Sequence, residues 1–443
     1  MSWWKLKRPA PQAGSVLFRG RWVARPEDFA FLERRGIQIG PPTRPEGGGW
    51  SLPLEHREWG RAKLLALPDM MLPPGSLVDL DHRLDEEEKS AVRGCGSALA
   101  MSVEPRTGNV LADRKDLLRF LHAALGEEGI GAVDHLGQAF WSRAALEEEL
   151  AHGAELDIDN IYTIHLMYDP EQTEQEKRGY WLHTHGLRGL GFHDFDVLDP
   201  ADEFQGHAHE LSRALAFASV EGRLTANRPV DLVVGVQVRP VPAREFLAQA
   251  AASEHRKYRE TVDDEHLDGH LVLCDPAPTG WISRLMGRST VPRPSGFLRG
   301  PFPDEVLIQF SDSATELMAS RARLMLAVFR NLATELAEFD FPALVKLGFQ
   351  IDGGSEGQRE HLWFQVHGFK GDSVDATLIN APFQVGRLRV GQRGLQPLEL
   401  LSDWSIMTPF GHLNPRQTRT LRTVRKEQTR LREIVAELRS KPT

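Results

Sequence analysis

A stretch dense in proline and glycine, from Asp275 to Glu305, divides the chain and limits every fold it can adopt. Proline removes a backbone donor and glycine loosens the chain, so neither a helix nor a strand is expected to run through it. Such stretches mark domain boundaries, because few contacts cross them. We therefore expect a linker at 281–303 with folding units on both sides, and 443 residues are enough for two or three domains.

Residues 91–280 alternate between apolar runs typical of strands and amphipathic segments typical of helices. Leu117 and Leu121 recur at helical spacing after Asp113, a residue type suited to cap a helix. No glycine-rich phosphate loop lies between the segments, and the pattern predicts an α+β sandwich. Residues 1–90 are dense in proline, glycine and tryptophan, and we expect them to form an irregular N-terminal extension packed on this domain.

Residues 304–412 contain one long amphipathic segment and several short strand-like runs. They are expected to form a smaller α+β domain with a strongly curved, partly barrel-like sheet, because the short strands follow one another closely. Lys370–Asp372 predicts a tight hairpin turn between two of the strands. Residues 413–443 predict a basic amphipathic helix, with Leu431 on its apolar stripe.

Charge and composition exclude several classes of protein. The net charge is −9, from 53 basic and 62 acidic residues, which argues against a nucleic-acid footprint over the whole chain. The chain contains no run of about 18 apolar residues, so no membrane helix is expected. The first residues lack the apolar core of a secretory signal. Cys95 and Cys274 are far apart and form no C-x-x-C pattern, so we expect two small buried residues, no disulfide scaffold and a cytoplasmic location.

The residues from Glu360 to Ile406 follow a recognisable order. They include Glu360 and Trp363, Gly371 and Asp372, Leu378, Asn380 and Pro382, Gly391, and Asp403 with Trp404. In this order and spacing, roughly 300–410 resembles the bacterial domain of unknown function numbered 2314, with Gln392 where that pattern has an acid. The resemblance implies a strand-rich module. Related domains occur beside bacterial toxin and immunity genes, which implies binding to another protein.

The middle of the chain carries a second resemblance, in the run YWLHTHGLRGLGFHDFDVLDP. It is similar to a related uncharacterised family, numbered 4026, which carries the first domain at its end. Neither family has an assigned catalytic residue, so the resemblance transfers no site to this chain.

Histidines gather in the same run. Five of them fall within 27 residues: His183, His185, His193, His207 and His209. Because alternate strand residues share a face, His183 and His185 point the same way, as two ligands of one metal would. With His193 they are candidate ligands of zinc or another divalent ion that keeps an open position for water. The alternative is that they are structural and pack beside Trp181. The spacing is not H-E-x-x-H, and no other cofactor is expected.

Acidic residues offer a weaker candidate site. Asp157, Asp159, Asp194 and Asp196 lie near the ends of predicted strands, where a pair of carboxylates could serve a hydrolase. Acids also stop strands and face water at such positions. A serine nucleophile has no support, because no G-x-S-x-G motif is present.

Aromatic residues mark a candidate binding surface in the last third. Trp363, Phe364, Phe383 and Trp404 could line a peptide-binding groove on the small sheet, although such a density also forms cores. The leading hypothesis is a non-enzymatic protein-binding module, immunity-like or stress-related. The alternatives are a metal-dependent hydrolase and, more weakly, nucleic-acid binding by the basic C-terminal helix, which could instead dock on the protein itself or on a second copy as a homodimer.

Overall fold

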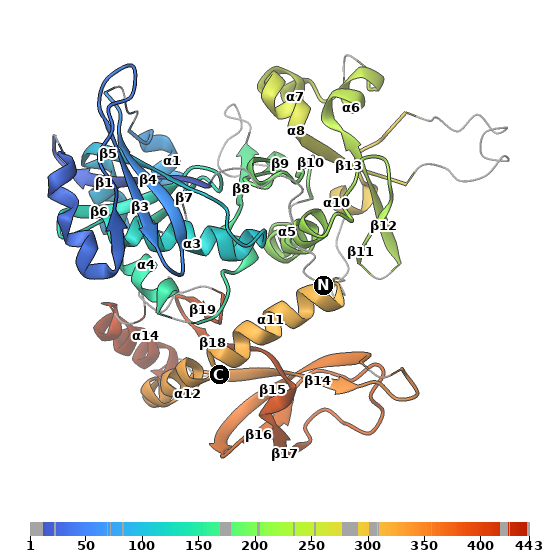
Figure 1. Cartoon of the computed structure of the whole chain (residues 1–443). Coiled ribbons are helices and arrows are strands. Elements are labelled where there is room, and N and C mark those ends of the chain that lie inside the picture. The colour runs from blue at the N-terminus through green and yellow to red at the C-terminus, as the bar shows by residue number, and fades with distance from the viewer. Residues whose placement is uncertain are drawn as a thin grey trace. The chain divides into compact units, whose positions relative to one another are not determined.

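The computed structural model contains two compact units, each described by itself (Figure 1). The N-terminal unit comprises Met1–Asp81, Ser90–Arg143 and Leu156–Ser311, and the C-terminal unit comprises His82–Lys89, Ala144–Glu155 and Asp312–Thr443. The structure describes residues 12–21, 24–68, 70, 72–81, 84–151, 153–168, 179–201, 204–233, 235–251, 254–276, 291–300, 308, 310–355, 357–416, 424 and 426–440. Most of the predicted linker, 281–303, lies outside these residues.

Seven antiparallel strands form the first sheet of the N-terminal unit, in the order β2-β3-β4-β5-β1-β6-β7. They are β1 (Gln12–Arg19), β2 (Ile37–Ile39), β3 (Trp50–His56), β4 (Gly60–Ala66), β5 (Cys95–Val103), β6 (Gly129–Asp134) and β7 (Ala139–Ser142). Four of these strands lie within 1–90, so the prediction of an irregular extension is wrong. The glycines that suggested loops occupy the turns: Gly47, Gly48 and Gly49 precede β3 with positive φ, and Gly60 opens β4.

Helices accompany this sheet. They are η1 (Pro26–Arg35), α1 (Gly75–Leu80) and α3 (Val110–Ala124), and α2 (Glu86–Arg93) straddles the boundary between the units. Leu117 and Leu121 of α3 are fully buried, as their spacing predicts. The cap is Asn109 rather than the predicted Asp113: the Asn109 side chain accepts hydrogen bonds from the backbone N–H of Leu111 and Ala112.

Six strands form the second sheet of the N-terminal unit, in the order β11-β12-β13-β10-β9-β8. They are β8 (Thr163–Tyr168), β9 (Gly179–His185), β10 (Asp194–Leu198), β11 (Val230–Val233), β12 (Val236–Pro242) and β13 (His270–Cys274). The accompanying helices are η2 (Ile158–Asn160), η3 (Arg188–Leu190), α5 (Phe204–Val220), α6 (Ala243–Gln249), α7 (Arg256–Thr261), α8 (Asp264–Gly269) and α10 (Gly296–Arg299). Only β10 and β13 pair in parallel among these described strands, and this pairing sets His270 beside Asp194.

One face of this second sheet packs against α6 and α7. Trp181 of β9 and Val272 of β13 share a buried cluster with Phe246 of α6 and Tyr258 of α7. His266 lies in α8, which leads directly into β13. Residues of β8, β9, β10, β13 and α8 therefore meet under this cover, and the candidate site is built there.

The C-terminal unit holds a six-stranded antiparallel sheet in the order β17-β16-β15-β14-β18-β19. Its strands are β14 (Ala343–Gln350), β15 (Arg359–Lys370), β16 (Ser373–Leu378), β17 (Arg393–Pro397), β18 (Leu401–Thr408) and β19 (Gly411–Leu413). Its helices are α4 (Arg143–Leu150), α11 (Asp312–Leu324), α12 (Leu326–Glu335), η4 (Ala337–Phe339), η5 (Leu398–Leu400) and α14 (Gln428–Ser440). The predicted hairpin turn is confirmed, because Lys370 pairs with Ser373 across Gly371.

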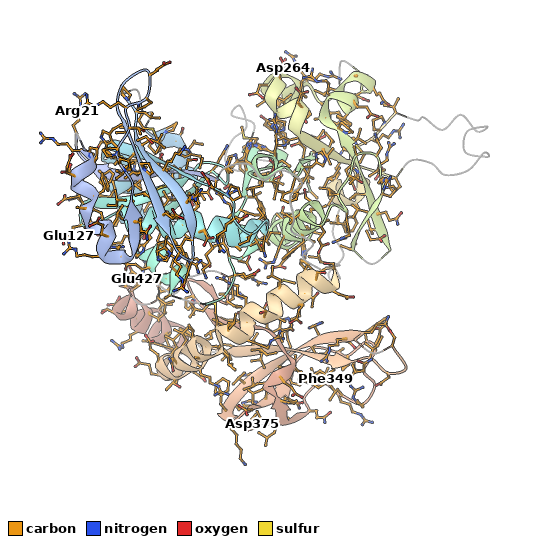
Figure 2. The ribbon with its side chains drawn as sticks, in the orientation of Figure 1. Arg21, Glu127, Asp264, Phe349, Asp375 and Glu427 are labelled. Carbon is orange, nitrogen blue, oxygen red and sulfur yellow. The ribbon has the colours of Figure 1, made fainter. Side chains whose placement is uncertain are left out.

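This sheet is open, and the prediction of a strongly curved, partly barrel-like sheet is not supported. The edge strands β17 and β19 do not pair with each other in the described ladder. Its outer side chains alternate with buried ones: along β16, Val374 and Ala376 are buried, whereas Asp375 between them forms an ion pair with Arg393. Asp375 and the core residue Phe349 are labelled in Figure 2. The short strands form an open antiparallel sheet, in which β18 lies beside β14, rather than a partly closed barrel.

The helix α14 buries its apolar stripe within the C-terminal unit itself. Leu431 and Val435 belong to the same core as Phe329 and Trp404. The described side chains of this stripe are therefore buried within one chain. They are not available for the homodimer contact that we expected from the sequence.

Candidate functional site

The hairpin of β8 and β9 brings three histidines together. His165 pairs with His183 across the two strands, and His185 lies two positions beyond His183 on the same face. One ligand atom from each of the three rings lies within 4.8 Å of those of the other two. We call His165, His183 and His185 the three-histidine group.

The spacing of these rings matches a shared ion. Their centroids are 5.2 Å apart for His165 and His183, 5.0 Å for His165 and His185, and 4.7 Å for His183 and His185. Imidazoles that bind one tetrahedral zinc at about 2.0–2.1 Å have centroids about 5 Å apart. The group therefore has the dimensions of a three-histidine metal site.

His183 is held in place by packing, and one of its ring nitrogens has no hydrogen-bond partner among the described residues. Its ring stacks on Trp181 with centroids 4.0 Å apart, and only 4% of the residue is exposed. Its buried Nδ1 makes no hydrogen bond to any described residue. An unsatisfied buried polar atom costs about 1–3 kcal/mol, so a ligand at this nitrogen would relieve a real penalty.

The protonation state of the group also suits metal binding. Burial, with the neighbouring histidines adding to it, lowers the pKa of His183 to about 2 and the pKa of His185 to about 3. Both imidazoles are therefore neutral near pH 7, and a neutral imidazole keeps a nitrogen lone pair for a metal.

Asp196 lies on β10, the strand next to β9, where it pairs with His183, and it is completely buried. It accepts hydrogen bonds from Trp181 Nε1 at 3.1 Å and from the Tyr258 hydroxyl at 2.7 Å. It also accepts from His266 Nε2 at 3.0 Å and His270 Nδ1 at 3.1 Å. Because a carboxylate only accepts, these contacts assign the proton positions of both rings.

The charge of Asp196 is stabilised by these donors. Burial alone would raise the pKa of this carboxyl. The hydrogen bonds from His266 and His270 outweigh burial and hold the pKa well below its usual range. Asp196 is therefore an ionised carboxylate that orients the rings and the tryptophan around the three-histidine group.

Asp196, His266 and His270 also have ligand atoms within 4.8 Å of one another, but they fit a metal less well. The rings of His266 and His270 stack with centroids only 3.4 Å apart, closer than the roughly 5 Å of two rings on one tetrahedral ion. Asp196 already accepts four donors. We interpret these residues as a hydrogen-bonded scaffold beside the three-histidine group, with the His183 and His266 centroids 5.4 Å apart.

His193, the third ligand predicted from the sequence, is not in the three-histidine group. Its backbone N–H donates to the Ser219 hydroxyl, and that hydroxyl donates back to the His193 carbonyl. The structure places His165 with His183 and His185 instead. Sequence reasoning missed His165, although its position inside the polar-interrupted strand NIYTIHLMYDP was a signal, and it had no means to find His266 and His270.

The acidic residues proposed as a catalytic pair are occupied elsewhere. Asp157 accepts hydrogen bonds from the two terminal nitrogens, Nη1 and Nη2, of the buried Arg213 at 2.7 and 2.8 Å. Asp159 forms an ion pair with the same arginine. Asp194 accepts from the Thr184 hydroxyl and from the backbone N–H of Arg188. These contacts support a structural role for the three acids.

The aromatic candidates of the C-terminal unit do not share a groove. Phe364 and Trp404 are each 1% exposed and lie in the core, so their predicted binding role is corrected: apolar rings on the inner face of a sheet are buried by the helices that cover it. Trp363 is half-buried beneath Lys346, whose Nζ lies 5.5 Å from the ring centroid. Phe383 alone of the four is largely exposed, at 85%.

Neither cysteine resembles a nucleophile. Cys274 is fully buried, and burial raises the pKa of its thiol to about 12. Cys95 is half-buried, and burial raises the pKa of its thiol as well. Both thiols stay protonated near pH 7, and the thiolate is the reactive form.

Several basic residues near the C-terminal helix form ion pairs. Lys426 contacts Asp85 at 2.7 Å, and Arg432 contacts Glu338 at 3.1 Å.

Comparison with known families agrees with both resemblances and with their order. The family model described as "Protein of unknown function (DUF4026) C-terminal" matches residues 164–241, and the model described as "Uncharacterized protein conserved in bacteria (DUF2314)" matches residues 316–428. The first match contains the three-histidine group and Asp196, whereas His266 and His270 lie beyond it. No curated protein and no solved structure matches the chain. In the described residues, no helix has the length and apolar character needed to cross a membrane.

Proposed function

We propose that the N-terminal unit is a metal-dependent hydrolase in which His165, His183 and His185 bind one divalent ion of the zinc class. The observation that carries this proposal is the convergence of three imidazoles with centroids 4.7–5.2 Å apart. Catalytic zinc sites use three protein ligands and leave a fourth position for water.

The surroundings of the group support an open position. His183 is buried, whereas His165 and His185 are partly exposed, so solvent reaches one side of the group. A zinc ion at such a site lowers the pKa of bound water to about 7 and so supplies hydroxide for attack on a carbonyl or phosphoryl centre. Trp181, itself hydrogen-bonded to Asp196, stacks on His183 and holds that ring before any ion binds, which limits the cost of assembling the site.

Elemental analysis of the purified full-length chain tests the proposal. After loading with zinc and dialysis against a weak chelator, about one equivalent of zinc is expected to remain. The variants His165→Ala and His183→Ala should each lose it, because two imidazoles hold the ion less tightly than three. Zinc that fails to exceed the level of a chelator-treated sample would end the proposal.

His193→Ala is the matched control, since His193 lies in the same segment but outside the three-histidine group. It should retain its zinc. Loss of zinc from His193→Ala together with retention in His165→Ala would instead support the ligand set predicted from the sequence alone.

A second candidate function, which the family resemblance favours, is binding of another protein by the C-terminal unit. The specific observation is the exposure of apolar side chains in the segment between β16 and the edge strand β17 and in β17 itself: Phe383 at 85%, Val390 at 56% and Leu395 at 54%. Exposed apolar groups next to a free strand edge are typical of surfaces that accept an extended segment of a partner.

Photo-crosslinking in bacterial cells that make the protein tests this second function. A photoreactive residue at position 383 is expected to give one adduct of defined mass, because a partner strand would cover Phe383. The same residue at position 430, on the exposed side of α14, serves as the control. Identical adducts from both positions, or none from 383, would contradict the proposal.

A further inference from the structure

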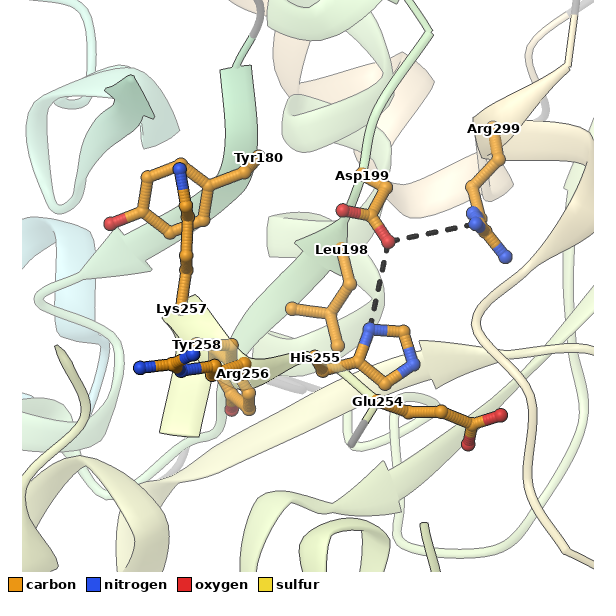
Figure 3. Close-up of a pocket in the computed structure, with 9 residues that line it drawn as sticks. All are labelled: Tyr180, Leu198, Asp199, Glu254, His255, Arg256, Lys257, Tyr258 and Arg299. Carbon is orange, nitrogen blue, oxygen red and sulfur yellow. Dashed lines mark ion pairs between the residues drawn. The ribbon is translucent and has the colours of Figure 1, made fainter. Parts of the chain in front are cut away.

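A surface pocket of about 390 Å³ lies at the end of β10 in the N-terminal unit (Figure 3). It is lined in part by Tyr180, Leu198, Asp199, Lys257 and Arg299 and contains none of the three candidate metal ligands. Small-molecule pockets span about 300–1,000 Å³, so this one has room for a compact ligand.

The backbone of the pocket is strained at two positions. Asp199 has φ 48° and His255 has φ 52°, both in the left-handed region that non-glycine residues adopt infrequently. Their side chains face each other, with His255 Nδ1 3.5 Å from Asp199 Oδ2. Such conformations persist only where the surrounding structure holds them, and they concentrate at ligand sites.

Arg299 lines the pocket and forms a long ion pair with Asp199, a carboxylate with which an anionic ligand would compete. Its guanidinium lies 3.6 Å from the Asp199 carboxylate, too far for a hydrogen bond, and its side chain is 45% exposed. Among the described residues it makes no closer polar contact. A planar fork of N–H groups in this state suits a carboxylate or a phosphate, which it can contact through two oxygens.

The opposite side of the pocket combines a cation with apolar surface. Lys257 Nζ lies 6.0 Å from the centroid of the Tyr180 ring, and Figure 3 shows the lysine alongside that ring, away from Arg299. Leu198 lies between the two sides. The anionic group of a ligand could therefore contact the cationic side chains, while a flat or apolar body could pack against Tyr180 and Leu198.

We infer that this pocket binds a small organic oxyanion, a carboxylate or a phosphate monoester on an apolar or aromatic body, with Arg299 as the main anion contact. The inference goes beyond the proposed metal centre and does not depend on it, because none of the three metal ligands lines the pocket; Tyr258, which lines it, contacts the centre only through Asp196. Binding is accordingly expected in chelator-treated protein.

Isothermal titration of the full-length, chelator-treated chain with benzoate and with phenyl phosphate tests the inference. One of the two should bind saturably at one site, and the preferred probe identifies the anionic group as carboxylate or phosphate. Arg299→Ala should weaken that binding about tenfold or more, and Lys257→Ala about threefold or more, since charge-assisted hydrogen bonds are the strong ones.

Arg256→Ala is the matched control. Arg256 also lines the pocket, but its guanidinium pairs with Glu260 at 2.7 Å, so the affinity should change less than about twofold. Circular dichroism of each variant shows whether it is folded, and Lys257→Ala decides the matter if Arg299→Ala is not. Absence of saturable binding by either probe, or an equal loss in Arg256→Ala, would overturn the inference.

Discussion

Two six-stranded sheets of this protein each bury a tryptophan, and they use it in opposite ways. In the N-terminal unit, Trp181 donates its indole N–H to Asp196 and stacks on His183. In the C-terminal unit, Trp404 stacks on Phe329 with centroids 5.0 Å apart, and its indole nitrogen makes no hydrogen bond to a described residue. One ring orients polar groups, and the other fills an apolar core.

The difference shows which of these two sheets buries polar groups that could serve a reaction and which buries only apolar side chains around its tryptophan. A buried carboxylate and the neutral imidazoles of His183 and His185 reduce the apolar contacts of the N-terminal unit's six-stranded sheet, and buried polar groups of this kind need partners. The C-terminal sheet carries apolar side chains on its inner face, where burial and packing stabilise it. Four substitutions, zinc and acid should affect the two units differently, and the largest effect is expected for Trp404.

Trp404→Ala should cause the largest loss. Removal of a fully buried tryptophan costs about 3–5 kcal/mol, through lost burial and the cavity left behind. Hydrogen exchange of peptides from the C-terminal sheet should report a lower free energy of opening. Trp363→Ala, at a half-buried position on the outer side of the sheet, should lose much less; equal losses would show that Trp404 is not a core residue.

Asp196→Asn should destabilise the N-terminal unit by about 3 kcal/mol, because four donors lose a charged acceptor that is completely buried. The amide also turns one donor toward others. Chemical denaturation followed by peptide-level hydrogen exchange measures the change. Asp375→Asn is the control on an exposed ion pair and should give no measurable change; a neutral result for Asp196→Asn would remove its scaffold role.

Zinc should stabilise one sheet and leave the other unchanged. At a free concentration of 100 times its dissociation constant, a ligand that binds only the folded state adds about 2.7 kcal/mol. Exchange should slow in peptides of β8 and β9 and stay constant in peptides of β14 and β15. The variant His183→Ala should abolish the effect, and equal slowing in both units would indicate nonspecific binding.

Acid should weaken the C-terminal sheet through His361. Burial, with Lys346 and Arg359 nearby, lowers the pKa of this residue to about 4. Its ordinary pKa is about 6.5, so between the two values the unfolded chain binds a proton that the folded chain refuses. Stability is therefore complete above pH 6.5 and falls as the pH drops toward 4, by roughly 2 kcal/mol at pH 5.

His361→Gln separates this residue from other acid-sensitive groups. The amide can still meet the Ser402 hydroxyl, which lies 2.7 Å from His361 Nδ1, but it cannot gain a proton. Urea denaturation at pH 7 and pH 5 should show a smaller difference for His361→Gln than for the unchanged chain. The same difference in both would assign the acid effect to other residues.

Phe383→Ser should have the smallest effect on stability, about 0.5 kcal/mol or less, because the side chain is largely in solvent. Thermal denaturation measures it. A loss of several kcal/mol would mean that Phe383 packs against the chain, and it would remove the exposed surface on which the proposed protein contact rests.

Part of this comparison was accessible from the sequence. Three features follow from local patterns: the same-face placement of His183 and His185, the hairpin at Gly371 and the apolar stripe of α14. Such patterns can be read from the sequence because they depend only on residues close to one another along the chain. His165 and Asp196 join the site by strand register, which depends on which strands pair. His266 and His270 join it only because β13 pairs in parallel with β10 after a crossover.

The N-terminal strands show the same limit in another form. Proline and glycine in residues 1–90 indicated turns correctly but concealed the strands between them. Those strands gain their order from partners distant in sequence, such as β1 with β5 and β6. The predicted barrel failed for a related reason, since strand length alone does not determine whether a sheet closes.

By itself, the sequence determined the order of the two family resemblances, the same-face placement of His183 and His185, and the absence of a long apolar run. Tertiary structure decided which histidine joins them, which carboxylate orients the scaffold and which aromatic rings are buried. The physical reason is that side-chain direction along a strand follows from a local period of two residues, whereas convergence at a site follows from pairings between segments many residues apart.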